Sequence, residues 1–172
     1  IPTPNSLLED GWWQVIRRMA GRRPYLWRNH REAIDKHYLE KGISSAISFP
    51  TGGGKSTLAE LKIATCLLRN EKVVFLVPTH ALVDQTAKAL KDTFNTFEIV
   101  GDAMEDDFSI GDILVLPEAI VTTPERCLML MSMQPEAFAD LGLIVFDECH
   151  LLHPRDAERS RRSVDAMLAV LN

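Results

Sequence analysis

The chain has 172 residues, of which 46% are apolar and 25% charged, as in an ordinary soluble globular domain, and this length fits one domain. Its formal net charge of −5 does not by itself indicate a nucleic-acid partner, which would need only local phosphate contacts on one face. No run of about eighteen apolar residues occurs, which excludes a membrane-spanning helix, and no signal-peptide pattern is present.

Two further features bear on the origin of the chain. It begins with Ile1 rather than Met, which suggests an excerpt from a longer protein. It contains three cysteines, an odd number without a paired framework, which indicates a reducing compartment. We therefore expect a cytoplasmic or nuclear protein.

The first 42 residues predict a helical extension, and residues 43–172 are expected to form the main domain. One helix is expected over residues 6–19 and a second over residues 31–41. At the end of the first helix, two interpretations of an arginine-rich stretch stay open: a solvated helix end, or a surface that contacts nucleic-acid phosphates. Its members are Arg17, Arg18, Arg22 and Arg23.

A glycine-rich loop follows, between a short strand expected at 46–49 and a helix expected over 56–69. Glycines have no side chains, so their N–H groups can turn toward phosphate oxygens. Lys55 can reach the β- and γ-phosphates of a nucleotide, and the Ser56 hydroxyl can ligate Mg²⁺. The loop is therefore predicted to bind the phosphates of a nucleotide together with Mg²⁺. The residues of this cradle are Gly52, Gly53, Gly54, Lys55, Ser56 and Thr57.

The remainder of the chain alternates apolar strands with helices. This order predicts an α/β fold, with a mostly parallel sheet and helices on both of its faces. The expected strands cover residues 72–77, 96–100, 119–122 and 143–146. The expected helices cover residues 81–94, 125–133 and 155–171.

Two acidic residues, Asp147 and Glu148, directly follow the strand expected at 143–146. That strand is a continuous apolar run, the pattern of a parallel strand buried on both faces. A carboxylate at the C-terminal end of such a strand lies where open α/β sheets bind their ligands. Asp147 is predicted to hold Mg²⁺ through water, and Glu148 to orient and deprotonate the attacking water.

Four segments, in this order, resemble the motifs of the DExH-box helicases of superfamily two. Residues 49–57 resemble motif I, 78–85 motif Ia, 122–126 motif Ib and 147–150 motif II. The variants of motifs Ib and II are closer to Ski-type and related DNA-repair helicases than to DEAD-box RNA helicases. The resemblance implies a RecA-like P-loop domain, the first of two such lobes, with the second in the same full-length chain.

The resemblance also implies how this domain holds a nucleic acid. Motifs Ia and Ib would contact its phosphates without reading the base sequence. The residues concerned are Thr79, His80, Thr123 and Arg126.

Two histidines have roles that rest on the resemblance. His150 would couple the ATP site to the second lobe. Many relatives recognise adenine with a Gln upstream of motif I, and His30 occupies that position here. His30 could donate one hydrogen bond to the base, and the alternative is an ordinary residue on a surface helix.

We therefore expect the ATP-binding lobe of an ATP-dependent helicase, which couples Mg-ATP hydrolysis to movement on single-stranded DNA or RNA. Its catalytic residues would be Lys55, Asp147, Glu148 and His150. One alternative is a double-stranded DNA translocase or restriction-type motor subunit, which shares this lobe but need not unwind. The other is a nucleotide-dependent nucleic-acid clamp with little turnover, and the intact Glu148 argues against it.

Overall fold

The computed structural model describes residues 1–50, 52–101 and 115–147. The chain divides into two compact units, Ile1–Glu71 and Lys72–Asn172, called unit 1 and unit 2 below. Because a compact unit is not the same thing as a domain, the expected domain boundary after residue 42 stays a prediction.

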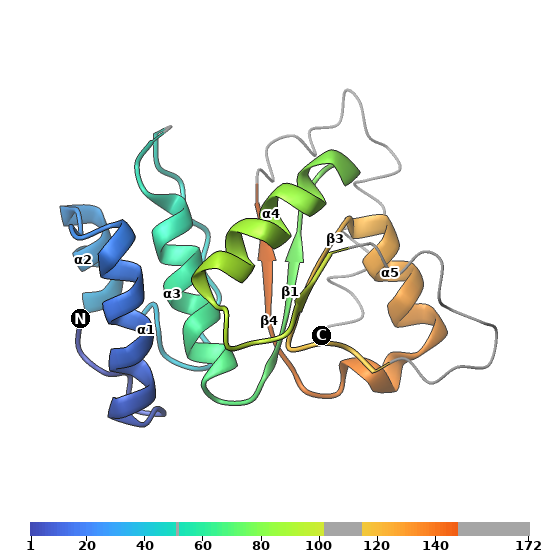
Figure 1. Cartoon of the computed structure of the whole chain (residues 1–172), viewed down its shortest axis with the longest axis horizontal. Coiled ribbons are helices and arrows are strands. Elements are labelled where there is room, and N and C mark those ends of the chain that lie inside the picture. The colour runs from blue at the N-terminus through green and yellow to red at the C-terminus, as the bar shows by residue number, and fades with distance from the viewer. Residues whose placement is uncertain (51, 102–114, 148–172) are drawn as a thin grey trace. The chain divides into compact units, whose positions relative to one another are not determined.

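Helices dominate the described part of unit 1 (Figure 1). They are α1 (Glu9–Arg22), α2 (Arg28–Asp35) and α3 (Lys55–Leu67). α1 packs against α3, and its buried side chains recur at the three- and four-residue spacing of a single helix face. α3 is buried around most of its circumference. The contact between α1 and α3 is therefore part of the packed interior of unit 1.

The first two expected helices have other bounds in the structure, 9–22 rather than 6–19 and 28–35 rather than 31–41, and one expected strand is absent from the described residues. α1 begins at Glu9 rather than at residue 6, because the N–H of Leu7 closes a turn on the carbonyl of Pro4, at 3.1 Å. α2 ends at Asp35 rather than at residue 41, and His37, with φ 62°, interrupts the helical backbone. Residues 43–50 form no strand, since a strand needs a neighbouring ladder and none of the described residues supplies one here.

A buried lysine ties α3 to the segment that follows α2. The Nζ of Lys62 donates to the carbonyls of Tyr38 at 2.8 Å and Glu40 at 2.7 Å, and only 6% of the residue is exposed. The Tyr38 hydroxyl in turn donates to the carbonyl of Leu58, at 3.3 Å. Burial lowers the pKa of Lys62 and raises the pKa of Tyr38 to about 12. Lys62 therefore satisfies two carbonyls that no helix or strand satisfies.

Unit 2 is built around a parallel sheet, as expected. Its described strands run in the order β2-β3-β1-β4, with every pairing parallel. The strands are β1 (Lys72–Leu76), β2 (Ile99–Val100), β3 (Ala119–Thr122) and β4 (Leu141–Phe146). β1 and β3 are almost fully buried, which is why their β-branched and aromatic residues occur in unbroken runs.

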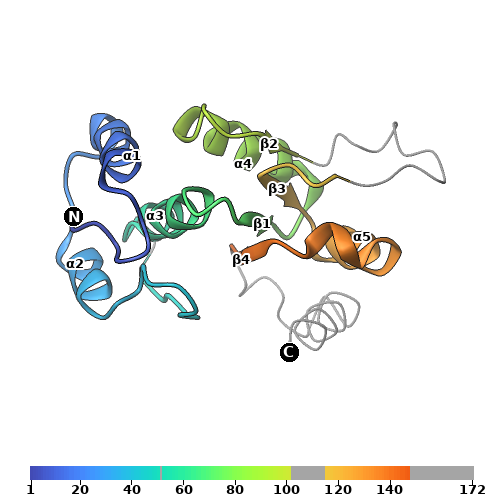
Figure 2. The same ribbon diagram turned by 90° about the horizontal axis from the view of Figure 1, so that it is seen from below.

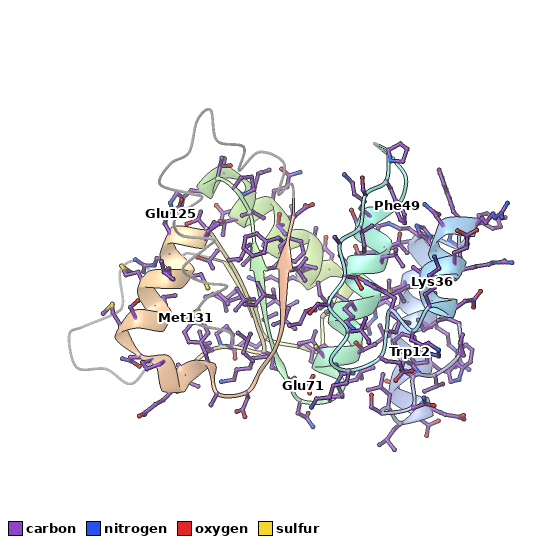
Figure 3. The ribbon with its side chains drawn as sticks, turned by 180° about the vertical axis from the view of Figure 1, so that it is seen from behind. Trp12, Lys36, Phe49, Glu71, Glu125 and Met131 are labelled. Carbon is purple, nitrogen blue, oxygen red and sulfur yellow. The ribbon has the colours of Figure 1, made fainter. Side chains whose placement is uncertain are left out.

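Helices cover both faces of this sheet, α4 (His80–Thr93) on one and α5 (Pro124–Met133) on the other (Figure 2). Beneath α5, alternate residues of β1 and β3 meet the buried side of the helix and a short 3-10 helix, η2 (Pro135–Phe138). Met131 of α5 belongs to this cluster (Figure 3). The buried members are Val74, Leu76, Leu116, Ile120, Cys127, Leu130, Met131 and Phe138.

Two expected strands differ from those observed. β2 covers only Ile99–Val100 rather than residues 96–100. β4 is half-buried rather than buried on both faces, and it lies at an edge of the described sheet. The helix expected over 155–171 lies outside the described residues. Among the helices that are described, none has the length and apolar character needed to cross a membrane.

Replacing Lys62 by Met should destabilise unit 1. Methionine fits a similar volume but leaves the carbonyls of Tyr38 and Glu40 without their donor. A loss of about 2–4 kcal/mol in the free energy of unfolding is expected, since each unpaired buried polar group costs about 1–3 kcal/mol. Denaturant unfolding followed by circular dichroism measures it. Lys36→Met, at an exposed position, is the control, and equal stability of the two variants would contradict the assigned role.

Candidate nucleotide and nucleic-acid sites

The glycine-rich loop of unit 1 makes a tight turn that enters α3 directly. Gly52 and Gly54 have φ values of 79° and 81°, in the left-handed region that favours glycine. Between them, the N–H of Gly53 donates to the carbonyl of Pro50, at 2.8 Å. Gly54 is the N-cap of α3, and its carbonyl accepts the first helical hydrogen bond, from Thr57 at 3.0 Å.

Close packing also requires glycine in this loop. A Cβ on Gly53 would lie 2.8 Å from the Cβ of Phe49 and 2.8 Å from the carbonyl oxygen of Pro50. A Cβ on Gly54 would overlap the imidazole of His30. Phe49 lies beside the N-terminal end of α3 (Figure 3). The loop is therefore bare backbone, pressed against its neighbours.

The start of α3 has the features that an anion-binding site needs. The first N–H groups of a helix have no intrahelical acceptor, and the helix dipole adds positive potential at the same end. Lys55 is half-buried and Ser56 is exposed at this end of α3. These residues fit the phosphates of a nucleotide, with an ammonium, a hydroxyl and backbone donors in one short segment.

His30 lies in α2, directly against the loop. It is only 2% exposed, so its interpretation as an ordinary residue on a surface helix is wrong. Its Nδ1 accepts a hydrogen bond from the backbone N–H of Trp27, at 3.3 Å, and its ring lies 6.3 Å from that of Phe49. A role for His30 in adenine recognition stays a prediction.

The contacts of two residues near the start of α3 were not predicted from the sequence. Asn29 donates from Nδ2 to the carbonyl of Gly53, at 3.1 Å. Arg23 donates to the Thr57 hydroxyl at 3.4 Å and pairs with Glu60 at 3.0 Å, so part of the arginine-rich stretch makes an internal contact. Only the position of Asn29 at the start of a helix could have drawn attention to it.

The pKa of the Glu60 carboxyl is shifted by its burial and by its contact with Arg23. Burial raises the pKa of Glu60, and the charge and hydrogen bond of Arg23 act in the opposite direction. Arg23 therefore offsets part of the cost of burying Glu60 in the second turn of α3. The same guanidinium engages Thr57, whose predicted contact with the nucleotide stays untested.

In unit 2 the predicted motifs gather at one edge of the sheet. The N–H of Asp147 donates to the carbonyl of Leu76 at 3.1 Å, and the N–H of Val77 donates to that of Thr122 at 3.0 Å. The ends of β4, β1 and β3 therefore lie side by side. This is the edge at which open parallel sheets bind their ligands. Asp147 is exposed there.

The motif residues after β1 and β3 start the two covering helices. Thr79 and His80 are exposed at the start of α4. Thr123 is 3% exposed, and its hydroxyl accepts from the N–H of Arg126 at 3.4 Å, as an N-cap of α5. Glu148, with Cys149 and His150, lies outside the described residues.

The sequence matches the DEAD/DEAH box helicase family over residues 27–171, most of the chain. Among curated relatives, the ATP-dependent DNA helicase Hel308 of Pyrococcus horikoshii is 32% identical over 132 residues, which is 76% of this chain and 18% of that protein. The antiviral helicase SKI2 of Saccharomyces cerevisiae is 27% identical over 128 residues, 73% of this chain and 9% of that protein. The chain thus spans less than a fifth of the length of these relatives.

A comparison with solved structures also finds helicases, on the basis of the fold. The DUF1998 helicase MrfA aligns with a TM-score of 0.66 at 17% identity, over 95% of this chain and 27% of MrfA. A second MrfA structure, described as bound to DNA and AMPPNP, aligns with a TM-score of 0.62 at 20% identity, over 88% of this chain and 22% of that one. Sequence and fold agree, and the chain belongs to the DEAD/DEAH box helicase family.

Proposed function

We propose that the chain is the ATP-binding lobe of a nucleic-acid helicase or translocase, which hydrolyses Mg-ATP to move along single-stranded nucleic acid. The observation that carries the proposal is the turn at Gly53 and Gly54, where bare backbone leads into α3 and Lys55-Ser56 follow at once. Family membership and the ATP-dependent relatives support the same conclusion.

In this proposal each cradle residue has a separate task. The N–H groups at the start of α3 and the Lys55 ammonium bind the phosphates and stabilise the charge that develops on them. Ser56 and Asp147 would hold Mg²⁺, which neutralises phosphate charge when it is bound. Glu148 acts as the general base toward water, and His150 couples this site to a second lobe.

The nucleic acid is proposed to bind at the sheet edge of unit 2. Thr79 and His80 start α4, and Thr123 and Arg126 start α5, so two helix N-termini supply backbone donors for phosphate oxygens. The hydroxyl of Thr123 already caps α5, so we assign it to ordering that helix start. The DNA-bound MrfA structure and the names of the relatives support a nucleic-acid partner.

Replacing Glu148 by Gln in the full-length protein tests the function. The amide preserves shape but cannot take a proton, so turnover of Mg-ATP should fall by about 10²–10⁴, the usual contribution of a general base. Nucleotide affinity should remain near that of the wild type. Steady-state ATPase assays and equilibrium binding measure the two quantities. Glu136→Gln, at an exposed position of η2, is the control, and turnover of Glu148→Gln within a few fold of wild type would contradict the assignment.

Lys55→Ala should weaken nucleotide binding without unfolding the protein. The substitution removes an ammonium that is assigned to the ligand, and a charge-assisted hydrogen bond of about 1.5–3 kcal/mol corresponds to about 10–100-fold in affinity. Calorimetric titration with Mg-ADP measures the change, alongside a circular dichroism spectrum. Lys88→Ala, on an exposed part of α4, should bind as the wild type does. Unchanged affinity in a folded Lys55→Ala protein would remove Lys55 from the site.

Arg126→Ala should weaken binding of single-stranded nucleic acid equally for unrelated sequences. A lost phosphate contact also lowers the salt dependence, by about one unit of slope. Fluorescence anisotropy at several salt concentrations measures both effects. Thr123→Ser keeps the cap of α5 and should bind normally, whereas Thr123→Ala is expected to lose about 1 kcal/mol of stability. A loss restricted to one sequence would exclude phosphate binding at this position.

A further inference from the structure

Two consecutive side chains of α2 hold the phosphate loop at two consecutive glycines. Asn29 donates from Nδ2 to the carbonyl of Gly53, at 3.1 Å, and the imidazole of His30 lies where a Cβ of Gly54 would be. The pair is also linked internally, because the N–H of His30 donates to Oδ1 of Asn29, at 3.0 Å. Asn29 thus bonds the peptide that joins Gly53 to Gly54, and His30 packs against the α-carbon of Gly54.

The contact of Asn29 fixes the direction of a backbone donor. In a planar trans peptide the C=O and the following N–H point in opposite directions. A hydrogen bond that holds the Gly53 carbonyl toward α2 therefore turns the Gly54 N–H away from α2. Gly54 is the N-cap of α3, so this N–H belongs to the group of donors assigned to the nucleotide phosphates.

The nitrogens of His30 are not available to a base. Nδ1 accepts from the Trp27 N–H at 3.3 Å, so the neutral ring carries its hydrogen on Nε2. Nε2 is buried, lies against Gly54, and has no hydrogen-bond partner in the described part of the chain. The adenine or guanine base of a nucleotide could therefore contact neither nitrogen. A change in the conformation of the loop, in contrast, would change the surroundings of Nε2, which lies against Gly54.

We infer that Asn29 and His30 are positioning residues for the phosphate loop, and that they act on the phosphates of the nucleotide rather than on its base. Asn29 sets the direction of the Gly54 N–H. His30 packs against Gly54 and keeps an Nε2–H donor beside the loop. The inference rests on the proposed function, because it concerns the same nucleotide site.

The test compares ligands that share phosphates but differ in their base. Mg-ADP, Mg-GDP and inorganic triphosphate are titrated into the full-length protein and its variants by calorimetry. Asn29→Ala should weaken binding of all three by a similar factor, about tenfold for one lost hydrogen bond, and the ADP-to-GDP affinity ratio should not change. A loss confined to ADP, or no loss, would overturn the inference.

Two replacements of His30 separate its donor from its packing. His30→Asn can keep an acceptor for the Trp27 N–H but has no group at the Nε2 position, whereas His30→Gln keeps a donor there. Triphosphate affinity should fall in His30→Asn and recover in His30→Gln. Equal affinities would overturn the role of the Nε2–H. Asp35→Ala, exposed at the end of α2, is the control for changes on this helix.

The same titrations separate this inference from the proposed function. If the wild type binds none of the three ligands, the proposed function fails and the inference falls with it. If the wild type binds and Lys55→Ala does not, while Asn29→Ala binds like the wild type, only the inference fails. Thermal melting of each variant identifies any that lose affinity through unfolding. If His30→Asn is unstable, the triphosphate affinity of His30→Gln decides whether the Nε2–H is needed.

Discussion

The parallel hydrogen bonding of β1 to both of its neighbours is the constraint on which the sheet edge of unit 2 depends. Leu76 is in register with Thr122 of β3 and with Phe146 of β4. Three segments far apart in the sequence therefore end at the same level. The residues that follow them, which carry the predicted chemistry, need no long side chains to meet, because the backbone has already aligned them.

The glycine-rich loop of unit 1 depends on a different constraint: the atoms packed around two of its residues leave no space for a side chain. At Gly53 and Gly54 the neighbouring atoms leave no room for a Cβ. This closeness allows a short amide such as that of Asn29 to reach the loop backbone. The loop is thus shaped from outside, by packing, as well as by its own φ values. A substitution in α2 can consequently affect the backbone of a loop that lies 24 residues away in the sequence.

Much of the fold could be predicted from the sequence. Apolar runs bounded by turn residues gave β1, β3 and β4 and the helices that follow them, because buried parallel strands have a strong composition signal. The predicted strand at 46–49 was wrong because a strand exists only with a partner, and pairing is a non-local property. The burial of β4 was overestimated for a similar reason. An apolar run does not show which other elements will pack against it.

The candidate site was predicted unevenly. The glycine turn that enters α3 could be predicted because its residues are adjacent in the sequence, and the assignment of Gly52 to Ser56 to a nucleotide stays a prediction. The contact of Asn29 with Gly53 joins two positions that only tertiary structure brings together, and no local pattern encodes it. The burial of His30 could not be predicted from the sequence either, because an isolated histidine in a polar helix resembles a surface residue. Roles for Glu148 and His150 rest on the family resemblance.

The strand order also has a consequence for synthesis of the chain. β1 lies between β3 and β4, both of which come later in the sequence. While the ribosome adds roughly 5–20 residues per second, β1 therefore waits on the order of seconds before β4 can pair with it. During that time β1, which is apolar from Val73 to Leu76, has at least one open edge, the feature that promotes strand-to-strand aggregation. This edge of β1 closes only when β4, which ends at Phe146, is available to pair with it.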